Sequence, residues 1–203
     1  MTARVDEDGP LRTRGEVRRT LILDAAIEQF AARGIRATSM AHIAEAAGVS
    51  RPAVYQYFQN KDEVFASAFI GLFENLVARA IAALDAPGTT AQRLDGFLQR
   101  YEGDLWERTS ASPHVDEIID AKNDKIEAAT AQLVSSLSAS LGTFLNDVAP
   151  VRGNGGRQRN ETTVDLLRLG PKGFRYDQPS VAVFRRRLTM LAQAVAADLE
   201  GTD

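Results

Sequence analysis

Residues 38–61 read TSMAHIAEAAGVSRPAVYQYFQNK and carry most of the information about the fold. Ser39 can cap a short helix through its hydroxyl, and Gly48 stands where the chain must leave that helix with a positive φ. Ser50 can cap a second helix, and Pro52 fits only the first turn of that helix, where its missing N–H costs no hydrogen bond. The stretch therefore predicts two short helices joined by a tight turn.

A longer helix is expected upstream of this pair. Thr13 and Glu16 form a capping-box pattern at its start, and Gly34 is expected to end it. Apolar residues recur along it every four positions and should pack on the apolar positions of the two short helices, closing a small core of three helices. These residues are Ile22, Ala26 and Phe30 on the long helix and Ile43, Val49, Val54 and Phe58 on the short ones.

In order and spacing, the stretch resembles the tetracycline-repressor (TetR) family of bacterial regulators. The family pattern is a capped helix, Ile-Ala, Ala-Gly-Val-Ser, a short recognition helix, Tyr-x-Tyr/His-Phe and a following lysine. Here these are Ile43-Ala44, Ala47-Gly48-Val49-Ser50, Tyr55, Tyr57-Phe58 and Lys61. The specific likeness runs from about residue 14 to residue 65. Beyond it, only an all-helical layout is shared.

The resemblance implies that the second short helix reads DNA. Arg51, Ala53 and Gln56 would face the major groove, where they can meet guanine, a thymine methyl and adenine respectively. Arg51 could instead be only a phosphate clamp, because the start of such a helix lies near both backbone and bases. Ser50 and Pro52 would start the helix at the DNA surface. Phosphate contacts are expected from Thr38, Ser39, Tyr55, Tyr57 and Lys61.

His42 departs from the family pattern, which often has an acidic residue at this position to complete the capping box. The reciprocal cap is therefore in doubt. The imidazole is interpreted as an exposed helix residue, with a phosphate contact as the alternative. The only other histidine is His114, and such a remote pair does not have the spacing of a metal site.

The charge of the chain is divided unevenly. The total is −3, yet residues 9–61 hold eight basic side chains against four acidic ones, a local net charge of +4. Binding to DNA depends on local potential and not on the total. The basic segment is also the one with the two short helices.

Composition excludes several classes of protein. No stretch approaches the roughly 20 apolar residues of a spanning helix, and residues 1–8 are acidic where a signal peptide would be apolar, which predicts a cytoplasmic protein without membrane partners. The chain has no cysteine and shows no nucleophile–base pattern, phosphate-binding glycine loop or metal-ligand spacing. We therefore expect no enzyme activity, metal or cofactor.

Only helices are expected beyond residue 60. Asn60, with Glu63 reaching back, should cap a helix about six turns long. The segment 150–160, with three glycines, predicts a mobile loop. Helices are expected over 61–84, 89–106, 115–148 (one helix, or two with a break near Asn123), 162–169 and 180–199.

Aromatic residues of the middle helices could converge on an apolar or amphipathic ligand, as the family likeness suggests. Core packing is the alternative, because an aromatic stripe at helical spacing needs no ligand to explain it. These residues are Phe69, Phe73, Phe97, Tyr101, Trp106 and Phe144.

The last two helices resemble the family's dimer-forming four-helix bundle. Their apolar stripe could pair two chains or, alternatively, close the core of one chain. The residues concerned are Leu166, Leu167, Phe184, Leu188, Leu191 and Val195.

Together these observations predict an all-α protein with a flexible arm over 1–12, a helix-turn-helix DNA-binding domain over 13–60 and a helical ligand-binding and dimerisation domain over 61–203. The predicted function is a homodimeric repressor that a small ligand releases from a near-palindromic operator. A helical adaptor that binds protein and has lost specific DNA binding is the alternative, although the basic head argues against it.

Overall fold

The structure is a computed structural model that describes residues 13–120, 124–150 and 153–201. All elements in these ranges are helical, as the sequence predicted. They are α1 Arg14–Ala37, α2 Met40–Ala46, α3 Arg51–Tyr55, α4 Lys61–Leu84, α5 Thr90–Leu98, the π-helical turn η1 Gln99–Gly103, α6 Asp104–Thr109, α7 Val115–Asp120, α8 Asp124–Val148, α9 Gly153–Gly173 and α10 Val181–Glu200. The predicted arm over 1–12 lies outside the described residues.

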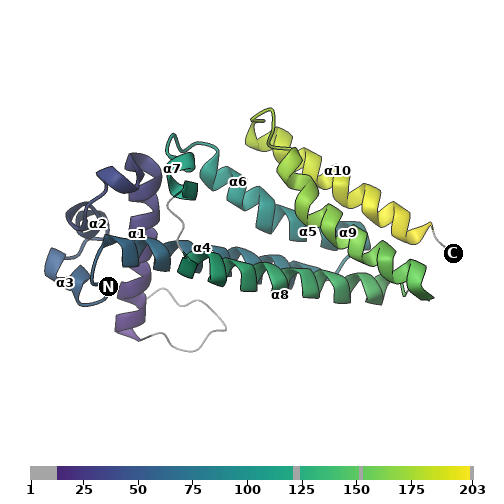
Figure 1. The fold of residues 1–203 in the computed structure, drawn as a ribbon, viewed down its shortest axis with the longest axis horizontal. Helices are drawn as coiled ribbons and strands as arrows, with labels where there is room; N and C mark the ends of the chain where they lie inside the picture. Colours follow the sequence, from purple (N-terminus) through teal and green to yellow (C-terminus); the bar gives the residue numbers. More distant parts are fainter. Residues whose placement is uncertain (1–12, 121–123, 151–152, 202–203) are drawn as a thin grey trace.

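The molecule is elongated, with α1, α2 and α3 at one end (Figure 1). We call these three helices the head and the helices from α4 to α10 the body. Helices α4 and α8 run side by side along the long axis, and α4 also packs on α1 and α5. Helix α10 lies against α5, so the end of the chain closes the far side of the body.

Local capping signals place the starts of the helices. The hydroxyl of Thr13 accepts the N–H of Glu16, and the Glu16 carboxylate accepts the N–H of Thr13 at 2.7 Å. The reciprocal cap of α2, which the sequence left in doubt, is present, because His42 Nδ1 accepts the N–H of Ser39 at 3.3 Å and so replaces the usual carboxylate. Glu63 reaches back to the N–H of Gln59 and not to that of Asn60, which caps α4 with its own side chain.

The core of the head is larger than the predicted three-helix unit. Ile22, Ile43 and Val54 are fully buried in it, together with residues of α4 and with Ile126 at the start of α8. Phe30 of α1 meets Phe65 of α4 edge to face at 5.4 Å between ring centroids. The head is therefore built on the body and shares its apolar interior.

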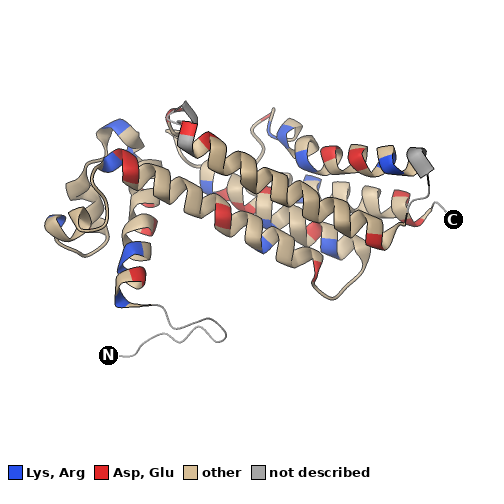
Figure 2. Ribbon diagram, turned by 60° about the horizontal axis from the view of Figure 1, so that its bottom comes forward, with Lys and Arg blue, Asp and Glu red and all other residues tan. Residues whose placement is uncertain are grey.

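Helix α4 is the one described helix that is long and apolar enough to cross a membrane by length and composition. Its apolar side chains, however, line both cores: Val64 and Phe65 pack in the head, and Leu76 and Leu84 pack in the body. Figure 2 shows how few charges α4 and α8 carry along their length. We conclude that α4 is the core helix that joins the two parts.

The predicted loop over 150–160 is largely wrong, because α9 begins at Gly153. Each glycine disfavours a helix by about 1 kcal/mol relative to alanine. Contacts with neighbouring helices compensate: Asn160 donates to Asn146 of α8 at 2.6 Å, and Arg159 pairs with Asp198 of α10 at 2.8 Å. Residues 115–148 form two helices, and the expected break near Asn123 falls outside the described residues.

Candidate DNA interface and ligand site

Helix α3 presents polar side chains on the outer side of the head. Ser50 caps it by accepting the N–H of Ala53 at 3.3 Å, and Pro52 occupies its first turn. Val54 is fully buried and anchors the helix, whereas Arg51 and Gln56 are exposed and Ala53 is half-buried. Because one side of α3 packs in the head, its other side is free to contact a partner.

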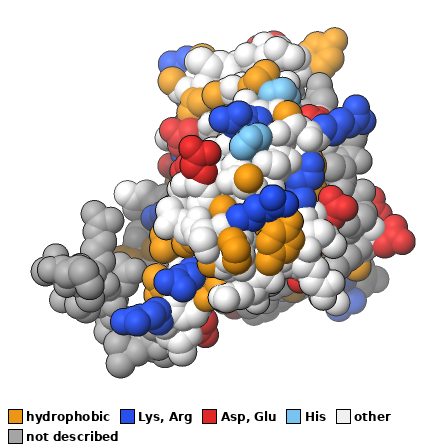
Figure 3. Space-filling model, turned by 90° about the vertical axis from the view of Figure 1, so that its left-hand side faces the viewer, with side chains coloured by type: hydrophobic (Ala, Val, Ile, Leu, Met, Phe, Trp, Pro, Cys, Tyr) orange, Lys and Arg blue, Asp and Glu red, His pale blue; other side chains and the backbone are white. Residues whose placement is uncertain are grey.

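The side chain of Arg51 contacts that of Tyr55, four residues further along α3. Its Nη2 donates to the hydroxyl of Tyr55 at 3.3 Å, and its guanidinium lies 5.6 Å from the centroid of the Tyr55 ring. Tyr55 is itself 45% exposed. Figure 3 faces this end of the molecule and shows Lys and Arg side chains across its middle, with acidic side chains nearer the edges.

Several residues predicted to contact phosphate have other partners. Thr38 is only 2% exposed, and its hydroxyl donates to the carbonyl of Gly34 at 2.7 Å, so it does not face solvent. Lys61 Nζ donates to the carbonyls of Ile35 and Arg36 at 2.6 and 3.3 Å. Both side chains therefore hold the end of α1.

The remaining predicted contacts lie beside α3. Tyr57 is half-buried against the head core, while Phe58 is buried below the guanidinium of Arg19 at 5.1 Å. Ser39 is half-buried at the N-terminus of α2, with its hydroxyl accepting the N–H of His42. A helix-turn-helix packed in this way, with Arg51 and Gln56 exposed at its second helix, has the arrangement found in DNA-binding proteins.

The aromatic residues predicted to line a ligand pocket do not converge. Phe69 and Phe73 stack at 4.8 Å in the head core, whereas the other four belong to or pack on the body core. Among the latter, Trp106 lies 5.4 Å from Phe184 and donates to the carbonyl of Pro179 at 3.2 Å. These aromatic side chains therefore pack in the two cores, which was the alternative to a ligand pocket.

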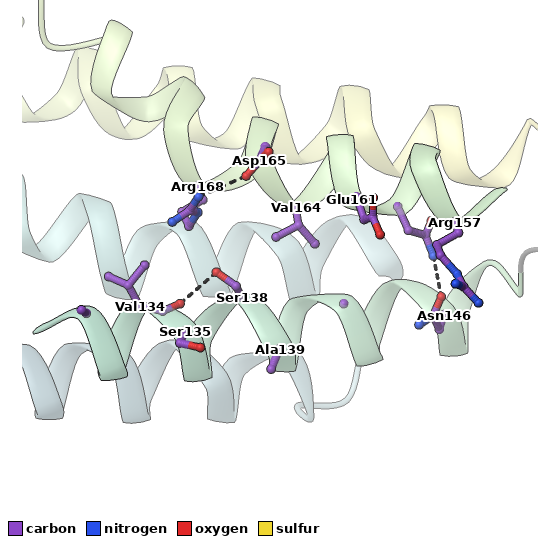
Figure 4. Close-up of a pocket in the computed structure, with 13 residues that line it drawn as sticks. Val134, Ser135, Ser138, Ala139, Asn146, Arg157, Glu161, Val164, Asp165 and Arg168 are labelled. Carbon is purple, nitrogen blue, oxygen red and sulfur yellow. Dashed lines mark hydrogen bonds and ion pairs between the residues drawn. The ribbon is translucent and has the colours of Figure 1, made fainter. Parts of the chain in front are cut away.

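A groove opens between α8 and α9 (Figure 4). Its volume is about 1020 Å³. Val164 and Arg168 point from α9 toward α8, which faces them with small side chains. The wall on α8 includes Ala131, Ser135, Ser138, Ala139 and Gly142; the wall on α9 includes Arg157, Asn160, Glu161, Asp165 and Arg168.

Two buried polar atoms of this groove have no hydrogen-bond partner. They are Asn160 Oδ1, in a residue 5% exposed, and Arg168 Nε. The other end of Arg168 pairs with Asp165 at 3.1 Å. The groove was not predicted from the sequence, in which the recurrence of small residues along α8 was its local signal.

A buried ion pair lies deeper in the body. Glu102, in η1, is 3% exposed and pairs with Arg175, which follows α9. Burial raises the pKa of Glu102, and Arg175 and Lys172 oppose that shift. Burial and the neighbouring Glu102 raise the pKa of Tyr101 to about 12. This cluster joins η1 to the corner between α9 and α10.

Most of the residues predicted to form a dimer interface close the core of the single chain. Leu167, Phe184 and Leu188 are fully buried, and Val195 is 5% exposed. Leu166 is 48% exposed and Leu191 is half-buried. Other apolar side chains are exposed on the same two helices: Leu169 of α9 is 44% exposed and Met190 of α10 is 64% exposed.

Comparison with known proteins agrees with this class. A family model for bacterial regulatory proteins of the tetR family matches residues 22–68. The HTH-type transcriptional repressor KstR2 of Mycobacterium tuberculosis is 34% identical over 94 residues, which cover 45% of this chain and 47% of that protein. The HTH-type transcriptional activator FasR of Mycolicibacterium smegmatis is 37% identical over 84 residues, 41% of this chain and 38% of that protein. The matched region thus spans less than half of either relative.

The whole fold has a counterpart among solved structures. A transcriptional regulator of the TetR/AcrR family from Thermobifida fusca superimposes with a TM-score of 0.64 at 20% identity, over 87% of this chain and 96% of that one. This likeness concerns the fold. The match over residues 22–68 gives this chain the DNA-binding domain of the TetR family of helix-turn-helix transcriptional regulators.

Proposed function

We propose that this chain acts in the cytoplasm as a homodimeric repressor that a small amphipathic ligand releases from a near-palindromic operator. The observation that carries the proposal is the exposed polar side of α3, above a fully buried Val54. KstR2 is described as a repressor and FasR as an activator, so the relatives include both kinds of regulator. Exposed Arg51 and Gln56 in a basic head favour DNA over the alternative of a protein adaptor.

In this proposal, Arg51, Ala53 and Gln56 meet base edges in the major groove. Tyr55 and Ser39 are placed beside them for phosphate contacts, with the N-terminus of α2 adding its free N–H groups and dipole. Ser50 and Pro52 fix where α3 begins. Thr38 and Lys61 support the same surface through their bonds to α1.

A dimer follows from the size of one head, which is too small to specify a genomic site alone. The exposed apolar side chains Leu166 and Leu169 of α9 and Met190 of α10 provide a face for a second copy. Leu191 lies beside Leu166 where both approach Gly170. This face replaces the buried residues that the sequence pattern suggested.

We place the ligand in the groove between α8 and α9 and not among the packed aromatic residues. The groove volume, about 1020 Å³, suits a drug-sized molecule. Its α8 wall of small residues can accept an apolar portion. The α9 wall carries polar and charged side chains, Asn160 and Arg168 among them, so the ligand should carry polar groups as well.

Fluorescence anisotropy on DNA tiled across the flanking intergenic regions, at several salt concentrations, tests the DNA claim. We expect tight binding to one near-palindromic tile and weak competition by random DNA. Weak, steeply salt-dependent binding to every tile would contradict a specific operator in these regions. The double variant Arg51→Ala with Gln56→Ala is the control, because it removes base contacts but leaves buried Val54 in place.

A variant that fills the groove tests the ligand site. A Cβ added at Gly142 would meet no atom within 4 Å, so Gly142→Leu should fit without disturbing the core. We expect it to weaken binding of the amphipathic dye 1-anilinonaphthalene-8-sulfonate while operator affinity stays unchanged. Gly71→Leu on α4 is the matched control, because Gly71 also has open space and lies outside the groove lining. Equal dye binding by both variants would contradict the assignment.

A further inference from the structure

The corner between α1 and α2 is held by the body. Gly34 breaks the last turn of α1 with φ of 78° and ψ of 163°, a conformation that favours glycine. A Cβ at Gly34 would lie 2.2 Å from Oε2 of Glu117, which belongs to α7. The glycine thus allows a carboxylate of the body to rest directly on the backbone of the head.

From this position Glu117 holds a backbone N–H group of the head. Its Oε1 accepts the N–H of Arg36 at 2.8 Å, across 81 positions of the chain. Nearby, Ser112 donates its hydroxyl to the carbonyl of Ala31 at 2.8 Å. His114 Nδ1 lies 3.8 Å from Glu117 Oε2. A hydrogen bond to a carboxylate is stronger than one between neutral groups, so this contact can fix the corner.

The corner leads directly into the DNA-binding helices. Ser39, which caps α2, follows Arg36 by three residues, so the backbone that Glu117 holds leads directly into the start of α2. Ile118 of α7 also packs on the head core. Helix α8 follows α7 in the chain and forms one wall of the groove. The segment that holds the head is thus followed in the chain by the helix that forms one wall of the groove.

We propose that Glu117 is a positioning residue for DNA binding, which sets the orientation of the head relative to the body by holding the backbone N–H of Arg36. The proposal rests on the proposed dimer, because the affinity of two heads for two half-sites depends on the distance between them. Glu117 touches no DNA in this proposal. Its effect is confined to the geometry of the corner.

The test combines hydrogen exchange with binding to two DNA fragments, one with the whole operator and one with a single half-site. In Glu117→Ala we expect the amides of residues 34–38 to exchange about tenfold faster. Affinity for the whole operator should fall about tenfold, while affinity for the half-site changes less than about twofold. Glu117→Gln keeps an acceptor oxygen and should lie nearer the wild type. Glu74→Ala, at an exposed acid of α4, is the control and should change neither quantity.

Three outcomes would overturn the proposal. Unchanged exchange at residues 34–38 would show that Glu117 does not hold the corner. Equal losses on the half-site and the whole operator would indicate a role in head stability alone, and unchanged operator affinity would remove the positioning role. The exchange measurement needs no DNA. If no tile contains an operator, faster exchange would leave the contact standing while the positioning role falls with the proposed function.

Discussion

Nζ of Lys61 lies 2.6 Å from the carbonyl oxygen of Ile35, so the first residue of α4 is tied to the last turn of α1. The carbonyl of Arg36 accepts a second, longer bond from the same ammonium. Carbonyls at the C-terminal end of a helix lack intrahelical partners and attract cations. Glu117 holds the N–H of Arg36 from the body side. Two opposite charges thus hold one short piece of backbone.

Lys61→Ala should destabilise the head. Loss of a charged donor to two carbonyls should lower the free energy of unfolding by about 1 to 3 kcal/mol. Because the ammonium is committed to these carbonyls, we expect the dependence of DNA affinity on salt to keep its slope. Urea unfolding and salt titrations measure the two effects. A slope reduced by about one unit with unchanged stability would instead assign Lys61 to a phosphate. Arg186→Ala, at an exposed cation of α10, serves as the control.

Arg51→Ala should weaken operator binding by about 1 to 3 kcal/mol and relax discrimination at one base pair. The reason is that an exposed arginine in the first turn of α3 can make two hydrogen bonds to guanine. Binding to a set of operators, each with one substituted base pair, measures this. A uniform loss across the whole set would identify Arg51 as a phosphate contact.

Tyr101→Phe should reduce the loss of folding stability at high pH. Between pH 10 and about 12 the unfolded chain loses the Tyr101 proton, whereas the folded chain retains it because its pKa is raised to about 12. Between pH 8 and pH 11 the free energy of unfolding should therefore fall by about 1 to 1.5 kcal/mol more in the wild type than in Tyr101→Phe. Urea unfolding at pH 8, 10 and 11 gives the difference. If the free energies of unfolding of the two proteins fell equally with pH, the raised pKa of Tyr101 would be contradicted.

Met190→Asp should separate the proposed dimer. A carboxylate placed on the exposed apolar face of α9 and α10 would be desolvated in the interface, which should raise the dimer dissociation constant by at least about a hundredfold. Sedimentation velocity at micromolar concentration measures the oligomeric state. Tyr176→Asp is the control, at a side chain that is 95% exposed in the corner between the two helices. A monomeric wild type, or a dimeric Met190→Asp, would contradict this interface.

The starts of the helices could be predicted from sequence because the groups involved are close in the chain. Thr13 and Ser50 each cap the helix that follows, as their patterns indicated. The start of α3 follows for the same reason, since Ser50 and Pro52 act on adjacent residues. His42 shows the limit, because its ability to replace a carboxylate depends on the orientation of its ring.

Features that depend on distant contacts were beyond the sequence. The start of α9 depends on contacts of Asn160 and Arg159 with α8 and α10, and glycine content alone suggested a loop. Periodicity placed Leu188 on an apolar stripe but could not tell whether that stripe faces the same chain or a second one. Glu117 could not be paired with Arg36 from the sequence, because the two residues lie 81 positions apart.

Helix α10 has a further consequence for how the protein is made. Phe184, Leu188 and Leu199 complete the body core, and they leave the ribosome last among the core residues. The head needs nothing beyond Ile126 for its own core. During translation the head can therefore fold first, while the body still exposes the apolar sides of α4 and α8. Until α10 is released, these apolar sides lack the residues that cover them in the folded body.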